Sequence, residues 1–257
     1  MRSVKIIFSL WLVCTLPAYG ALAVLNCGSN DDGGSGGTGA ITATVNVTGG
    51  SGHVVIVLGS FGATCSGNSM TLGNGQGDTV TIIGSQFTSN GGACVKVGYI
   101  KNATGNASAT YTVTPGNSQP DRTVVACEIS GADTSTPLDQ GPAGVEVTGA
   151  TNLVSGSITT TQADEVVFGV VGKGSFGSTL VAGSGSICSV SPGCATKTGS
   201  VDANHFAALE YLILTSTQTG TVNFTNGAST TAEVGAVSFS APIAATGTKT
   251  PSHSSAF

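Results

Sequence analysis

Charged side chains are scarce in this sequence. Among 257 residues there are 8 lysines and arginines and 13 aspartates and glutamates, so charged residues make up 8% of the chain, against roughly 25% in ordinary soluble domains. The few basic residues form no cluster, which excludes the patch that nucleic acids and anionic membranes require. We therefore expect no nucleic-acid partner, and a surface covered by serine, threonine, asparagine and glycine.

Aromatic residues are also few, at 5% of the chain, and the single tryptophan, Trp11, lies near the N-terminus. The tyrosines further along, Tyr99, Tyr111 and Tyr211, fall in expected strands where they can pack. Carbohydrate-binding modules usually stack sugars on exposed tryptophan or tyrosine. A stacking platform for sugars is therefore not expected, and binding of glycans through loop Asn, Asp and Ser residues is kept as an alternative.

Only three histidines are present: His53, His205 and His253. His253 falls in an expected tail, so a Ser-His-Asp triad would need His53 or His205. His205 and Glu210 are five residues apart on one expected strand, which places them on opposite faces. We expect a protein that is not an enzyme, with no catalytic residues and no cofactor-binding residues.

No apolar run is long enough to cross a membrane. The longest run near the N-terminus, Ile6 to Leu16, is far short of the roughly 20 residues that a span needs. It follows Arg2 and Lys5 and precedes the small residues Ala21-Leu22-Ala23, an order typical of a bacterial secretory signal peptide with an A-x-A cleavage site. We predict that residues 1–23 are a signal peptide, and hence a secreted or cell-surface protein.

Six cysteines would remain after cleavage, and an even number in an oxidising compartment favours disulfides. Pro192-Gly193 forms a turn between Cys188 and Cys194, which makes this pair the safest prediction. The four others, Cys27, Cys65, Cys94 and Cys127, allow three connectivities, and we favour Cys65–Cys94. A lipidated Cys27, which would make an outer-membrane lipoprotein, is the alternative, because a flexible-looking Gly/Ser/Asp-rich segment follows it.

Short runs rich in Val, Ile and Thr, separated by Gly, Asn, Ser and Pro, begin at about residue 40. Such runs predict an all-β fold, here an antiparallel β-sandwich, jelly-roll or Ig-like, stapled by disulfides. The continuous apolar run His53 to Leu58 indicates a central strand covered on both sides. We predict a linker over residues 24–39, one sandwich domain over 40–241 and a disordered tail over 242–257.

The segment Glu128-Ile-Ser-Gly-Ala-Asp-Thr-Ser-Thr-Pro-Leu-Asp139, with the strands around it, resembles a β-sandwich module of secreted and cell-surface bacterial proteins. The resemblance covers roughly Ile41 to Ser240. It implies a part of an adhesive, scaffold or appendage protein and no particular biochemical activity.

The same motif has a physical interpretation as a structural corner. Gly131 lets the backbone leave the strand, Asp133 and Ser135 can bond amides of the following turn, and Pro137 ends strand pairing. The alternative is a calcium site built on Asp133, Asp139 and nearby carbonyls.

These features together predict a non-enzymatic surface or appendage protein with a structural or adhesive role. Its expected partners are itself, to form an extracellular fibre, or other cell-surface components. A glycan- or calcium-binding module is the alternative.

Overall fold

The computed structural model describes residues 20–63, 65–84, 87–88, 92–174, 180–182, 195–198 and 207–243. Every regular element in this part of the chain is a β-strand, and all strand pairs are antiparallel. The predicted all-β, antiparallel, disulfide-stapled sandwich is therefore confirmed. The strands are β1 (Ala23–Asp31), β2 (Ile41–Val47), β3 (Val54–Phe61), β4 (Met70–Asn74), β5 (Thr81–Ile82), β6 (Phe87–Thr88), β7 (Cys94–Lys101), β8 (Asn106–Pro115), β9 (Thr123–Ser130), β10 (Leu138–Gln140), β11 (Val145–Val154), β12 (Ile158–Thr159), β13 (Asp164–Lys173), β14 (Leu180–Ala182), β15 (Ala195–Thr198), β16 (Ala207–Thr215), β17 (Thr219–Gly220) and β18 (Asn223–Ser240).

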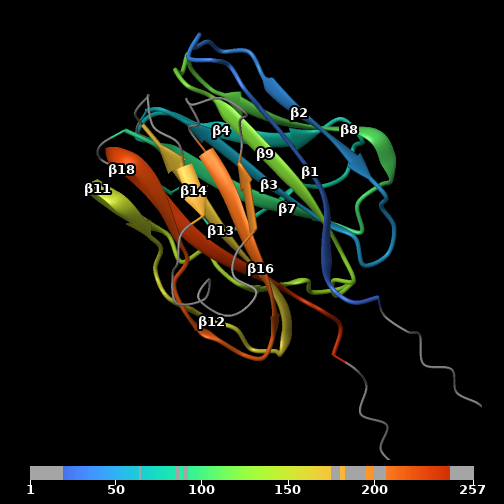
Figure 1. Ribbon diagram of the computed structural model, residues 1–257. Helices are drawn as coiled ribbons and strands as arrows, with labels where there is room; N and C mark the ends of the chain where they lie inside the picture. The colour runs from blue at the N-terminus through green and yellow to red at the C-terminus, as the bar shows by residue number, and fades with distance from the viewer. Residues whose placement is uncertain are drawn as a thin grey trace, which may run out of the picture.

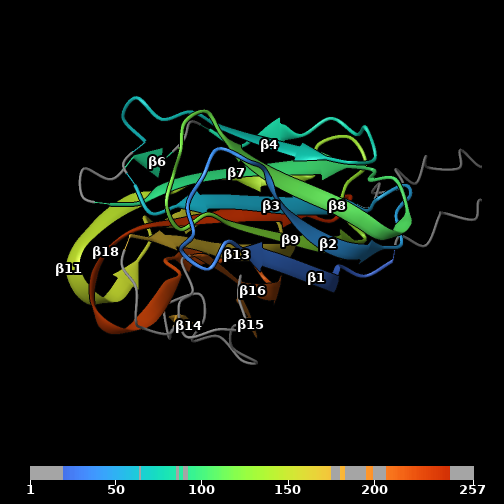
Figure 2. The same cartoon turned by 90° about the horizontal axis from the view of Figure 1, so that it is seen from above.

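The strands form three stacked layers (Figures 1 and 2). The central sheet has the order β1-β9-β3-β7-β5, with β6 also paired to β7. A sheet that we call the front sheet, β2-β8-β4, covers one face of it, on the side away from the viewer in Figure 1. The back sheet, β10-β18-β13-β16-β15 with β11 and β14 also paired to β18, covers the other face. The central sheet is therefore buried on both sides.

Strand β3 shows why the middle layer has a continuous apolar sequence. All eight of its residues are buried. Val54, Ile56 and Leu58 enter the core shared with the back sheet, while Val55 and Val57 enter the core shared with the front sheet. Since neighbouring residues of a strand point to opposite faces, only a strand between two layers needs apolar residues at every position.

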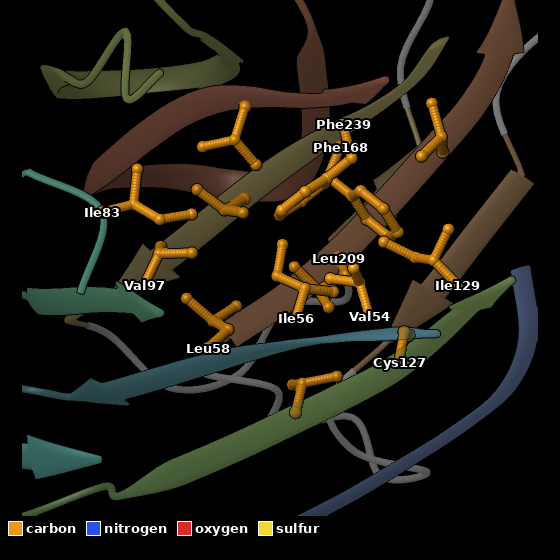
Figure 3. Close-up of a cluster of buried hydrophobic side chains, with 14 of the residues drawn as sticks. Val54, Ile56, Leu58, Ile83, Val97, Cys127, Ile129, Phe168, Leu209 and Phe239 are labelled. Atoms are coloured by element: carbon orange, nitrogen blue, oxygen red, sulfur yellow. The ribbon is translucent and has the colours of Figure 1, made fainter. Parts of the chain in front are cut away.

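The core between the central and back sheets contains two closely packed phenylalanine rings (Figure 3). Phe168 of β13 lies 6.2 Å from Phe239 of β18, centroid to centroid, at an interplanar angle of 82°. This edge-to-face packing is one of the preferred aromatic arrangements. Side chains of β3 and β9, including Ile56 and Ile129, approach the two rings from the central sheet.

The predicted linker over residues 24–39 is wrong. Residues 23–31 form strand β1, which pairs with β9 from Ala23↔Ser130 to Asp31↔Thr123. Gly28 lies so close to β2 that an added Cβ would be 2.1 Å from the carbonyl oxygen of Thr44. The Gly/Ser/Asp composition, which we interpreted as flexible, instead suits an edge strand that packs against backbone. The sandwich therefore begins before residue 40.

Candidate functional site

The solvent face of the front sheet carries a regular array of hydroxyl groups. Ile41, Ala43 and Val45 of β2 point into the core, so the residues between them face outward. The same alternation holds in β8 and β4. We call the outward-facing set the threonine face; its members, all exposed or half-buried, are Thr42, Thr44, Thr71, Thr110, Thr112 and Thr114.

Strand register aligns these threonines across the sheet. Thr42 lies opposite Thr112, Thr44 opposite Thr110, and Thr71 opposite Thr114. The hydroxyls therefore form rows spaced by about 4.8 Å between strands and by roughly 7 Å along a strand. An added Cβ at Gly73 would be 2.9 Å from Oγ1 of Thr112, so the glycine leaves the hydroxyl of Thr112 uncovered.

The three front-sheet strands contain no Lys, Arg, Asp, Glu or His. A face with donors and acceptors but no charge is suited to an uncharged polar partner, since it presents no ion that binding would have to desolvate.

Carboxylates elsewhere serve to hold loops. Glu128 of β9 is completely buried and accepts hydrogen bonds from Thr48 N (3.1 Å), Gly49 N (2.9 Å) and His53 Nδ1 (2.7 Å). These contacts hold the turn between β2 and β3, and so the edges of two layers, against β9. The His53–Glu128 pair has the geometry of a carboxylate that orients a histidine, but within the described residues no hydroxyl or thiol is hydrogen-bonded to His53.

The corner after β9 has the predicted structural role. Gly131 adopts a φ of 75°, in the left-handed region that favours glycine. Asp133 Oδ1 accepts hydrogen bonds from the backbone amides of Ser135 and Thr136, both at 2.7 Å. These bonds hold the pKa of Asp133 below its ordinary value. The opposing Asn102 secures the corner by donating to Thr134 O at 3.1 Å.

The second candidate calcium ligand, Asp139, is engaged in a different contact. Its Oδ2 accepts from Thr161 N at 3.0 Å and its Oδ1 from Thr161 Oγ1 at 2.5 Å. Burial acts to raise the pKa of Asp139, but hydrogen bonds with Thr161, Glu165 and Gln140 together outweigh it and hold the pKa low. Among the described residues no group of three His, Cys, Asp or Glu is placed to hold a metal ion. The contacts that Asp133 and Asp139 make are those of loop anchors.

A buried ion pair anchors the segment after β1. Asp32 and Arg122 are nearly inaccessible, with Nε of Arg122 2.7 Å from Oδ2 of Asp32. Arg122 also donates to the carbonyl of Gly39. Burial, reinforced by the negative charge of Asp32, raises the pKa of neighbouring Asp121 to about 6. Both ends of the segment 32–39 are thus held against the fold, although it lies in the predicted linker.

The back sheet contains ionisable groups that sequence analysis missed. Lys173 of β13 is completely buried and donates to Oδ1 of Asn226 at 3.2 Å. Glu233 of β18 is 3% exposed and lies opposite Glu146 of β11. Burial, and then repulsion from Glu146, raise the pKa of Glu233 to about 7. The sequence contains a signal for the burial of Lys173. It lies an even number of residues after Val167 and Val171, so its side chain points to the same side of a buried strand as theirs.

One disulfide joins two neighbouring strands of the central sheet, β1 and β9, and the other joins β7 of that sheet to the loop between β3 and β4. Cys65–Cys94, the favoured pair, is present, and Cys27 is bonded to Cys127. A sulfur atom in a disulfide cannot carry a lipid thioether, so the lipidated Cys27 is incompatible with this structure. Disulfides persist in oxidising compartments, which indicates that the folded chain resides in one. The predicted Cys188–Cys194 pair lies outside the described residues, as do His205, His253 and most of the proposed signal peptide and tail.

Comparisons with known proteins give no relative: no family model, no curated protein and no solved structure matches the chain. The resemblance of the Glu128–Asp139 segment to a surface module therefore stays a prediction. Within the part of the chain that the structure describes, no helix has the length and apolarity to cross a membrane.

Proposed function

We propose that the protein is a non-enzymatic, exported protein of the bacterial cell surface or of an extracellular appendage, with an adhesive role. The observation that carries the proposal is the threonine face, a regular, uncharged hydroxyl array on the outer side of the front sheet. Its partner in the proposal is an uncharged polysaccharide surface, whose hydroxyls can donate to and accept from the threonine hydroxyls.

The contacts of the charged groups support a role without chemistry. Glu128, Asp133 and Asp139 each accept hydrogen bonds that fix a turn, and Asp32 is paired with Arg122. These side chains hold the loops of the sandwich in place, and a rigid sandwich suits a protein that presents a binding face at the cell surface.

The experiment is a pull-down of the purified protein on insoluble cellulose, chitin and isolated cell walls. A Thr42→Val/Thr112→Val double variant keeps the shape of the side chains and removes two facing hydroxyls. We expect it to reduce retention on at least one polysaccharide about tenfold, which corresponds to roughly 1.4 kcal/mol. Thr159→Val is the matched control, because Thr159 is an exposed strand threonine of the β12–β17 pair, outside the front sheet.

Retention of the double variant equal to that of the unchanged protein would refute the threonine face as the contact surface. No retention on any polysaccharide would refute the proposed adhesion. Filaments in the same preparation, seen by electron microscopy, would favour the self-assembling role instead.

A further inference from the structure

Lys173 is the last residue of β13, on the face of the back sheet that points away from the central sheet. Its side chain is on the same side as Val171, and it is paired in register with Ala232 of β18. The apolar cluster on this face consists of Leu153, Val171, Leu180, Ala208, Phe224, Ala232 and Val234. None of the side chain of Lys173 is exposed to solvent. A charged ammonium group at such a site carries a large desolvation cost.

Asn226 holds its side-chain amide toward this lysine. It lies on β18, is 2% exposed, and its Nδ2 donates to the carbonyl of Ala228 at 2.7 Å. That bond fixes which end of the amide points to Lys173, so Oδ1 accepts from Nζ at 3.2 Å. Since a carbonyl bond is about 1.2 Å long, the carbonyl carbon Cγ lies within roughly 4.5 Å of Nζ. Attack requires the two atoms to approach to about 3–3.5 Å, about 1 Å closer than this upper bound.

We propose that Lys173 and Asn226 become joined by an intramolecular isopeptide bond. Neutral Nζ attacks Cγ of Asn226, an Nζ–Cγ bond forms, and the Cγ–Nδ2 bond breaks. The proton lost by Nζ is taken up by Nδ2, which leaves as ammonia. The product is a secondary amide, and the reaction needs no oxidant, reductant or cofactor.

Two properties of the site favour this reaction. Burial lowers the pKa of Lys173 to about 8, so a sizeable fraction of the amine is neutral near physiological pH, the state in which lysine is a nucleophile. Amide formation also removes the buried charge permanently. The bond would tie β13 to β18 and enclose the intervening chain, in a sheet for which the described residues show no disulfide.

The test is the intact mass of the purified full chain, measured after reduction and denaturation and compared with the mass expected for its observed N-terminus. We expect a deficit of one ammonia, about 17 Da, and a branched peptide containing Lys173 and Asn226 after proteolysis. A mass equal to that of the uncrosslinked chain would overturn the proposal. This measurement on the unchanged protein is decisive even if a variant does not fold.

Two variants locate the deficit. Lys173→Arg keeps a cation but removes the nucleophile, and we expect it to restore the full mass. Lys96→Arg is the matched control: Lys96 also has a pKa lowered by burial, but its Nζ donates to the backbone carbonyl of Met70 and not to a side-chain amide. It should keep the deficit. A deficit that persists in Lys173→Arg would place the ammonia loss elsewhere, for example in cyclisation of another asparagine, and would refute the isopeptide.

Discussion

The central and back sheets are stabilised by different means. The central sheet lies between two apolar cores, and both disulfides attach to it, through Cys127 on one face and Cys94 on the other. Only one face of the back sheet packs against the central sheet. The back sheet also contains four buried ionisable side chains, Glu165, Lys173, Glu210 and Glu233. Reducing agents should therefore weaken the first region, and pH should act on the second.

The difference follows from position in the stack. Most residues of a sheet covered by other sheets on both faces are apolar, and disulfides add to its stability. In the central sheet the buried carboxylate of Glu128 is an exception, which two backbone amides and the ring of His53 satisfy. The outer face of the back sheet is covered partly by the short strands β12, β14 and β17 and by neighbouring loops, whose polar groups give buried ionisable side chains hydrogen-bond partners. For example, Glu165 accepts from the amides of Thr161 and Gln162 at 2.9 and 2.7 Å.

The largest effect should come from removing the disulfide that fastens β1. Cys27 and Cys127 are 100 residues apart in sequence, and chain entropy predicts a loss of about 4.7 kcal/mol of unfolding free energy for a closed loop of that length. We expect a Cys27→Ser/Cys127→Ser variant to lose about this amount in urea denaturation monitored by circular dichroism.

The matched comparison is Cys65→Ser/Cys94→Ser, which removes a disulfide spanning 29 residues. Its loss should be smaller, about 3.6 kcal/mol. If the two variants were equally stable, or the shorter loop mattered more, the stabilisation would come from local packing and not from loop closure.

The same contrast explains how far the sequence could predict the fold. Apolar runs located the middle layer well: the run His53 to Leu58 became β3, which is buried on both sides. Strand β1 was missed because its residues, Asn26-Cys27-Gly28-Ser29-Asn30, have little apolar alternation. It is held by backbone pairing, a disulfide and the close approach of Gly28 to β2, and none of these depends on a local pattern.

The candidate sites were harder to predict for a similar reason. The threonines of β2 and β8 were visible in the sequence, but their alignment into rows depends on strand register. Lys173 and Asn226 are 53 residues apart and meet only through the pairing of β13 with β18. Asp133 could be assigned to its turn because its partners are two and three residues away.

An intermediate effect should come from pH, acting on the back sheet through Glu233. Its folded pKa, about 7, lies above its ordinary value of 4.5, so between these two pH values the folded state holds a proton that the unfolded state has lost. Its stability contribution is therefore complete below about pH 4.5 and is lost as pH rises through 7. We expect the unfolding free energy to fall by about 3 kcal/mol over that window because of this one group.

Glu233→Gln tests the assignment, because the neutral amide has nearly the same shape and does not titrate. The difference in unfolding free energy between the unchanged protein and this variant should change with pH between about 4.5 and 7 and be flat outside that window. Taking the difference cancels the similar contribution of Asp121, whose pKa is raised to about 6. Parallel pH profiles for the two proteins would show that Glu233 does not titrate in this range.

The smallest effect concerns the N-terminal end of the core that the two sheets share. Leu22, just before β1, is 7% exposed and belongs to the cluster between the central and back sheets. Cleavage after Ala23, as the A-x-A pattern predicts, would remove it. Burial of a leucine contributes about 1.5–3 kcal/mol, and a position at the edge of a core should give the lower end of that range. We therefore expect a chain beginning at Ala21 to be about 1.5 kcal/mol more stable in urea than one beginning at Val24. Equal stability of the two chains would mean that Leu22 adds nothing measurable to the shared core.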